Sequence, residues 1–192
     1  PCPIANCAKR DRGSQSGTDF SKEALDAFLL GRHVITEATA AGAMTEAQWA
    51  VVQAQATIAS DAVEKCIAAT VVHYINDVTD DMALFDNGSF ADAANFTNLA
   101  KHWSEMKGFA LGLQFNPTSP FNGAADSSER TNLKTVLSNM GDAPVLADGS
   151  QNGVAATGTA AEAIAAYETK LLAARDILAT AYGFSSADVA DW

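Results

Sequence analysis

The sequence predicts an all-α protein, and three observations carry this prediction: helical spacing of apolar residues, cap motifs ahead of those segments, and composition. About a fifth of the 192 residues are Ala and five are Pro, which favours helix because Ala is the strongest helix former and Pro the weakest. No stretch alternates apolar and polar residues beyond a few positions, as a half-buried strand would. We therefore expect an elongated antiparallel helical bundle of four to five main helices.

The first two predicted helices are separated by Gly42. Apolar residues recur at helical spacing over 19–41, which predicts the first helix there. Thr45 and Gln48 form a capping box, in which each side chain accepts a hydrogen bond from the other residue's backbone N–H. The second helix then runs without Gly or Pro over 45–77, a length on the order of 48 Å, and this length predicts that the bundle is elongated.

Turn and cap motifs define three further helices. The turn residues before position 90 and the Asn-Pro pair after position 115 predict a helix over 90–115. Cap motifs open a short helix over 126–140 and a long one over 159–182, and a glycine directly follows each, as is typical of a C-cap. The segment 142–158 between them is a long loop, of a length that usually indicates function or disorder.

Ala on the contact faces lets helix axes approach closely, so we expect seams of small residues with aromatic residues between them. Ala69 and Ala166 are expected seam positions, where enlargement to Leu should cost about 1–3 kcal/mol. The aromatic residues expected in these seams are Phe28, Trp49, Phe96, Trp103, Phe109 and Tyr167.

The predicted organisation is an N-terminal arm over residues 1–18, flexible or tethered by a disulfide, followed by a single helical-bundle domain over 19–192. The three cysteines are Cys2, Cys7 and Cys66, so one disulfide and one free thiol are expected. All three pairings stay open from the sequence. A pair of cysteines so close to the start favours an oxidising compartment, and we expect an exported protein in a periplasmic, outer-surface or extracellular location.

Charge and hydropathy exclude two classes of partner. The formal net charge is −11 and the sequence pI is near 4.5, which leaves no basic surface for phosphates and disfavours both nucleic acid and anionic lipid. No run of about 18 apolar residues occurs, so we expect no membrane span.

Each of the three histidines is followed at helical spacing by a carboxylate. The pairs are His33 with Glu37, His73 with Asp77, and His102 with Glu105. Such a pair on a helix either shares a metal ion or orients the imidazole through a hydrogen bond. In an acidic chain the same spacing also arises by coincidence on a solvated surface, where it contributes only a few tenths of a kcal/mol.

His102 is the strongest of the three candidates, because apolar residues surround it in the sequence. Cys66 lies seven residues before His73, on the same helical stripe, and is a candidate sulfur ligand. The chain lacks a serine-hydrolase order of nucleophile and base, a His-Glu-x-x-His pair and a Cys-x-x-Cys pair.

The segment AKHWSEMKGFALGLQFNP, residues 100–117, resembles a bacterial family of exported proteins of unknown function that is similar to the imelysins. The stretches over 141–146, 173–178 and 181–184 and the final Trp192 fit the same resemblance, which covers about residues 19–192. It implies an all-helical fold, a periplasmic, lipid-anchored or surface location, and a metal site at a His-x-x-Glu motif, which only His102 and Glu105 match. Family members carry an additional helical half before this part, so the resemblance also implies a missing N-terminal half.

These observations lead to three hypotheses. The first is a non-enzymatic, exported, imelysin-like helical protein that binds a transition metal ion (iron, zinc or copper) or a small ligand near His102 and Glu105. The second is a structural subunit of a bacterial surface or extracellular assembly, in which copies of the chain self-associate. The third is a hydrolase, for which only Glu105 offers a general base; we expect no enzyme.

Overall fold

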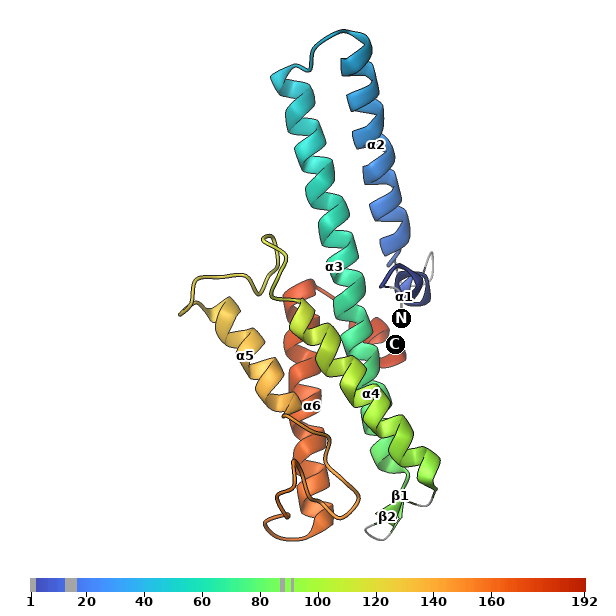
Figure 1. The fold of residues 1–192 in the computed structure, drawn as a ribbon, viewed down its shortest axis with the longest axis vertical. Coiled ribbons are helices and arrows are strands. Elements are labelled where there is room, and N and C mark those ends of the chain that lie inside the picture. Colours follow the sequence, from blue (N-terminus) through green and yellow to red (C-terminus); the bar gives the residue numbers. More distant parts are fainter. Residues whose placement is uncertain (1–2, 13–16, 87–88, 91) are drawn as a thin grey trace. The chain divides into compact units, whose positions relative to one another are not determined.

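The computed structural model describes residues 3–12, 17–86, 89–90 and 92–192. Within these residues the chain forms seven helices and one short β-hairpin (Figure 1), so the all-α fold class is confirmed. The helices are α1 (Pro3–Arg10), α2 (Phe20–Ala40), α3 (Glu46–Ala83), α4 (Ala93–Gly112), α5 (Ser128–Met140), α6 (Ala160–Tyr182) and α7 (Ser186–Asp191). The strands β1 (Phe85–Asp86) and β2 (Ser89–Phe90) pair antiparallel.

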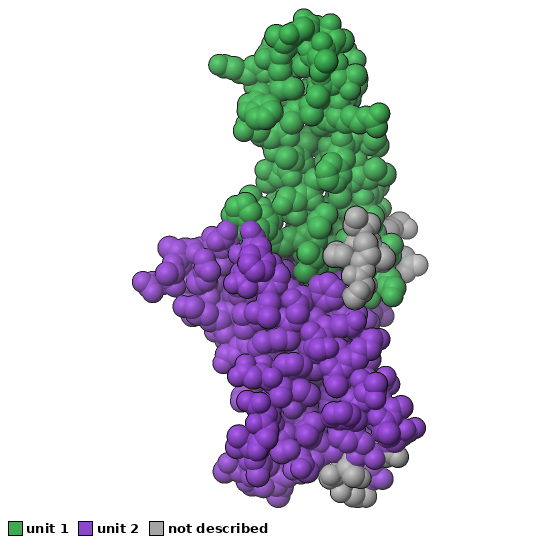
Figure 2. All heavy atoms as spheres, in the orientation of Figure 1, with its two compact units in different colours: residues 1–67, 116–119 green, residues 68–115, 120–192 purple. Residues whose placement is uncertain are grey.

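The chain divides into two compact units, coloured separately in Figure 2. Unit 1 comprises residues 1–67 and 116–119, and unit 2 comprises residues 68–115 and 120–192. The boundary falls within α3, so this helix contributes to both units. The predicted arm over 1–18 and single domain over 19–192 stay predictions, to which the structure adds that part of the arm is the helix α1.

In unit 1, α2 and the first part of α3 form an antiparallel pair (Figure 1), which we call the hairpin. The least exposed positions of each helix recur every three or four residues, which is the spacing of a coiled-coil seam. On α2 these are Phe20, Ala24, Ala27, Gly31, Val34 and Ala38, and on α3, as far as residue 60, they are Gln48, Val52, Gln55 and Ala59. A Cβ atom on Gly31 would lie 3.6 Å from that of Gln55, so small residues do allow close approach here.

A disulfide joins Cys7 of α1 to Cys66 of α3, with the two Cα atoms 5.0 Å apart. Of the three pairings left open by the sequence, the structure therefore has the one between these two residues, while Cys2 lies outside the described residues. The suggestion that Cys66 is a sulfur ligand is wrong, because its sulfur is bonded to Cys7.

In unit 2, the second part of α3 is followed by α4, α5, α6 and α7, and α5 packs along α6 (Figure 1). Fully buried apolar side chains from these helices form the core; they include Val72, Ile75, Leu99, Met106, Val136, Leu171 and Leu178. Local motifs set the ends of the last helices as predicted. Ser127 caps α5, and Thr159 and Glu162 form the predicted capping box of α6. Gly183 ends α6 in the left-handed conformation that favours glycine.

Three helix boundaries differ from prediction by three residues or more. α4 ends at Gly112 rather than at Phe115. α3 continues to Ala83, six residues past the predicted end. α4 begins at Ala93 with Asp92 as its N-cap, rather than at Phe90, because Phe90 belongs to the β-hairpin. There its ring contacts that of Phe85, its partner in the β-hairpin, edge to face, with centroids 5.2 Å apart.

Several expected seam residues are exposed instead. Ala69 is fully buried, as predicted, but Ala166 is exposed on α6. Phe28, Trp49 and Phe96 are 64%, 54% and 47% exposed, so the prediction that they lie in seams is wrong. Helical spacing identified an apolar stripe in each case, but smaller side chains occupy the helix–helix contacts.

Candidate functional site

One stripe of α3 carries three polar side chains of unit 2, each separated by one helical turn. His73, Asp77 and Asp81 follow at intervals of four residues, which places them on the same side of the helix. His102 of α4 reaches this stripe and contacts both carboxylates. The four side chains are between 10% and 27% exposed, so the cluster is partly buried but open to solvent.

The Nδ1 atom of each imidazole faces an acceptor. His102 Nδ1 lies 2.8 Å from Asp81 Oδ2, and His73 Nδ1 lies 2.7 Å from the backbone oxygen of Trp192. A backbone oxygen and a carboxylate both accept hydrogen bonds, so we assign the ring proton to Nδ1 in both histidines and let it donate. In the neutral ring this leaves the lone pair on Nε2.

Both Nε2 atoms point toward the same carboxylate oxygen. His73 Nε2 lies 3.2 Å from Asp77 Oδ2, and His102 Nε2 lies 3.8 Å from it. Two nitrogen lone pairs and an anionic oxygen at these distances repel one another when nothing lies among them. A hydrogen-bond donor such as water, or a metal ion near Asp77, would relieve this repulsion.

Surrounding residues hold both histidines in place. The ring of Tyr74 lies 5.0 Å from that of His73 and 6.0 Å from that of His102. Asn76 of α3 donates to the backbone oxygen of Val189 at 2.9 Å and accepts from Arg175 at 2.7 Å. The first contact attaches α7 to α3 next to His73, which positions the acceptor oxygen of Trp192, and the second attaches α6 to α3.

The structure brings together only part of the predicted set. His73, Asp77 and His102 converge, whereas Glu105 is not the partner of His102, whose Nδ1 bonds Asp81 instead. Glu105 Oε2 is buried and has no hydrogen-bond partner among the described residues. Among the described residues, no group of three or more His, Cys, Asp or Glu side chains is arranged so that it could hold a metal ion.

His33 and Glu37 lie on α2 in unit 1, and both are exposed. No hydrogen bond or ion pair connects these two side chains, each of which is among the described residues. Their pairing at helical spacing is consistent with a solvated helix surface, and their role as ligands stays a prediction.

Three other side chains of unit 2 close the C-terminal end of α5. Lys107 donates to the backbone oxygens of Leu137 and Gly141 at 2.7 and 2.6 Å, and Trp103 Nε1 donates to that of Met140 at 3.1 Å. Tyr167 donates to the same Met140 oxygen at 2.8 Å. These contacts satisfy the carbonyls that a helix end leaves unpaired, so Trp103 and Lys107 of the segment 100–117 have a structural role.

Burial shifts the pKa of two of these groups. Desolvation raises the pKa of Tyr167 well above the ordinary tyrosine value, and the hydrogen bond from Trp103 offsets this only in part. Desolvation also lowers the pKa of Lys107, while the carboxylate of Asp142 acts in the opposite direction. Tyr167 is thus a neutral hydrogen-bonding group throughout the physiological range.

Asp81 and the backbone oxygen of Trp192 are the site components that sequence reasoning missed. Asp81 continues the four-residue spacing of His73 and Asp77, so a search for stripes longer than one pair would have identified it. The contact of His73 with the chain end follows from the placement of α7, for which the sequence offers no local signal.

Comparisons with protein-family models, curated proteins and solved structures return no match for this chain. None of the described helices is both long and apolar enough to cross a membrane. The chemistry of the His73–Asp77–His102 cluster therefore carries the functional argument.

Proposed function

We propose that the protein binds a divalent transition-metal ion at Asp77, with His73 Nε2 and His102 Nε2 as the nitrogen ligands. The observation that carries this proposal is the convergence of both Nε2 atoms on Asp77 Oδ2 at 3.2 and 3.8 Å. Imidazole and carboxylate ligands suit zinc, iron and copper.

The hydrogen bonds behind the two imidazoles support the same proposal. Histidines that bind metals almost always donate their other ring N–H to a carboxylate or a backbone carbonyl, which fixes the tautomer and orients the ring. His102 donates to Asp81 and His73 to the backbone oxygen of Trp192, so both rings have this support.

The distances fit a small ion after side-chain adjustment. Ligands at about 2.1 Å from a tetrahedral metal are roughly 3.4 Å apart, and the two separations at Asp77 lie on either side of this value. The side chains do not enclose an ion as they stand. Binding therefore requires adjustment of the Asp77 side chain, which its 27% exposure allows, while the contacts at Nδ1 keep both rings oriented.

The broader proposal is a non-enzymatic, exported helical bundle of the imelysin-like type. The Cys7–Cys66 disulfide supports export, since such bonds persist in oxidising compartments. The all-helical composition and the segment 100–117 support the imelysin-like type. The metal site proposed here differs from the His-x-x-Glu motif, because its carboxylate comes from Asp77 rather than from Glu105.

The test is calorimetric titration of the metal-stripped chain with Zn²⁺, Fe²⁺ or Cu²⁺, together with elemental analysis of the purified protein. We expect one ion per chain, abolished binding in His102→Ala and Asp77→Asn, and about 10- to 100-fold weaker binding in Asp81→Asn, which removes only the orienting carboxylate. His33→Ala is the matched control, since it removes an exposed imidazole from unit 1, and it should bind as the native chain does.

Two results would overturn this ligand set. The first is the absence of binding in the native chain with all three metals. The second is loss of binding in Glu105→Gln with full binding in Asp77→Asn, which would assign the site to the His-x-x-Glu motif.

A further inference from the structure

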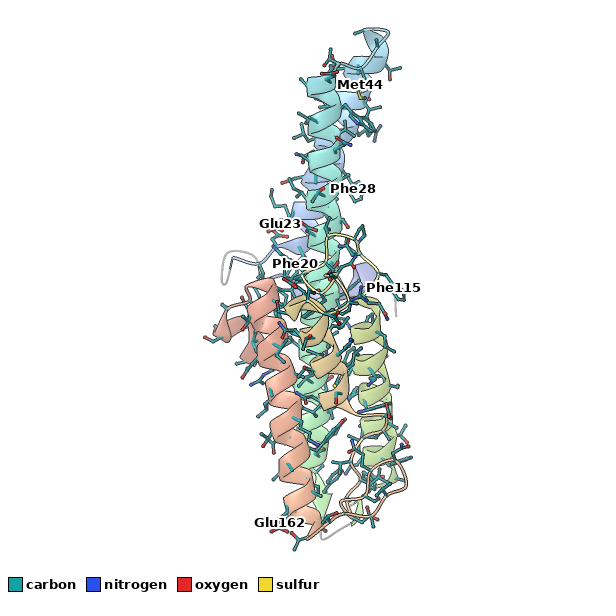
Figure 3. All side chains as sticks on the ribbon, turned by 90° about the vertical axis from the view of Figure 1, so that its left-hand side faces the viewer. Phe20, Glu23, Phe28, Met44, Phe115 and Glu162 are labelled. Carbon is teal, nitrogen blue, oxygen red and sulfur yellow. A yellow bond between two sulfur atoms is a disulfide. The ribbon has the colours of Figure 1, made fainter. Side chains whose placement is uncertain are left out.

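The hairpin of unit 1 carries many large apolar side chains that its own seam does not bury. Small residues such as Ala27, Gly31 and Ala59 fill the seam, so the larger side chains point away from it. Those that are between 37% and 64% exposed are Leu25, Phe28, Leu29, Leu30, Ile35, Met44, Trp49, Val51 and Ile58. Figure 3 shows Phe28 midway along the hairpin and Met44 near its tip.

A groove follows one side of the seam. Its volume is about 320 Å³, and its lining includes Phe28 and Ile35 of α2 and Val52 and Ala56 of α3. Trp49 lies three residues before Val52 and seven before Ala56, so helical spacing extends this apolar face toward the hairpin tip. The face is mostly apolar and open to solvent.

The same part of the chain is nearly free of charge. Residues 27–60 contain three formally charged side chains, Arg32, Glu37 and Glu46. Of these, Arg32 lines the groove, where its aliphatic stem adds apolar surface. Unit 1 has six basic and eight acidic residues, whereas unit 2 has six and fifteen.

We propose that this groove receives the hairpin of a second copy of the chain, so that two hairpins form a four-helix bundle about a two-fold axis. A two-helix hairpin buries only one stripe of each helix, and a second hairpin on the open face completes the arrangement in which such helices are stable. The pairing is self-complementary, because the same face serves both partners.

The charge distribution argues for a second copy as the occupant. Two chains that each carry a net charge of −11 repel one another over most of their surface, and the hairpin is where this repulsion is smallest. A strongly basic partner would find no carboxylate among the residues that line the groove, and an acidic partner would find only Arg32. The groove therefore suits a partner with a near-neutral, apolar helical surface. The hairpin of a second copy is such a surface.

The available area also meets the requirement of a stable dimer. A hairpin of helices about 20 residues long offers a face of roughly 30 by 20 Å, or on the order of 600 Å² before side-chain relief is counted. Standard interfaces bury roughly 600–1,000 Å² on each partner. One face of the hairpin is therefore large enough.

The test measures the mass of the full-length chain in solution by sedimentation velocity over a wide concentration range. A Cys2→Ser background excludes dimers linked through that thiol. We expect a reversible species of twice the chain mass of 20.0 kDa, and a dimer dissociation constant at least about 10-fold larger in Phe28→Glu. The matched control is Phe115→Glu, which places the same charge at a phenylalanine of unit 2 that is 76% exposed and should dimerise as the native chain does.

Three outcomes would overturn the proposal: a native chain that is monomeric at every concentration, a Phe28→Glu variant that dimerises as tightly as the native chain, or equal loss of dimer in Phe115→Glu. A monomer that instead binds zwitterionic lipid vesicles through Phe28 would assign the face to a membrane. Circular dichroism checks that each variant keeps its helices. The metal site lies in unit 2, so failure of either proposal leaves the other standing.

Discussion

Individual side chains of α4 serve two different purposes within six residues. His102 faces the carboxylates of α3, while Trp103 and Lys107 bond the carbonyls at the end of α5. The segment that looks like one motif in the sequence therefore contains a candidate ligand, His102, and two residues that close the end of α5. We call Trp103 and Lys107, together with Tyr167, the clamp. A variant in the clamp should change stability and leave metal binding intact.

Tyr167→Phe tests the clamp. The hydroxyl donates to the backbone oxygen of Met140 at 2.8 Å and accepts from Trp103 Nε1 at 3.0 Å, and the side chain is buried. Removing it should lower the free energy of unfolding by about 1 kcal/mol, because Trp103 keeps its bond to Met140. Urea denaturation of both proteins measures this loss, and an unchanged midpoint would show that the hydroxyl contributes nothing.

The candidate site shows which side-chain contacts can be predicted from the sequence. His73 and Asp77 are neighbours because they are one turn apart on a helix, and their spacing predicted the contact. The bond from His102 to Asp81 joins residues 21 positions apart on two helices. Such a bond depends on how α3 and α4 pack against each other. The spacing of residues within either helix does not predict this packing.

At the scale of elements, the capping boxes predicted from local chemistry were confirmed, whereas several predictions about side-chain burial were wrong. Thr159 and Glu162 fix the start of α6 through bonds within one turn, and Thr45 and Gln48 fix that of α3 in the same way. Whether Phe28 and Trp49 are exposed depends on a different factor, namely which side chains of α2 and α3 occupy the contact between the two helices. Periodicity identifies the apolar stripe of a helix without saying whether the same chain covers it.

Ala174→Leu tests how tightly α6 is packed. Ala174 is fully buried, so the larger side chain has no space and should cost about 1–3 kcal/mol of unfolding free energy. Ala166→Leu is the matched control on the same helix, where the exposed position should change stability by less than about 0.5 kcal/mol. Thermal melts of the two variants measure the difference, and equal melting temperatures would contradict a tightly packed α6.

At the scale of the whole molecule, charge and apolar surface are distributed unequally. Most of the acidic excess belongs to unit 2, which also carries the metal-site candidates, while unit 1 carries the exposed apolar hairpin. The two proposals therefore divide between the units: a cation in the acidic unit, and a second chain on the near-neutral hairpin.

The disulfide between Cys7 and Cys66 in unit 1 should contribute substantially to the stability of the folded chain. Cys7 and Cys66 are 59 residues apart in sequence, and closing a loop of that length restricts the unfolded chain enough to stabilise the fold by about 2–4 kcal/mol. We expect the Cys7→Ala/Cys66→Ala double variant to lose this amount in urea denaturation. The native chain in reductant should lose a similar amount, while the double variant should not respond to reductant. A native chain whose unfolding midpoint is the same with and without reductant would show that the link does not stabilise the fold.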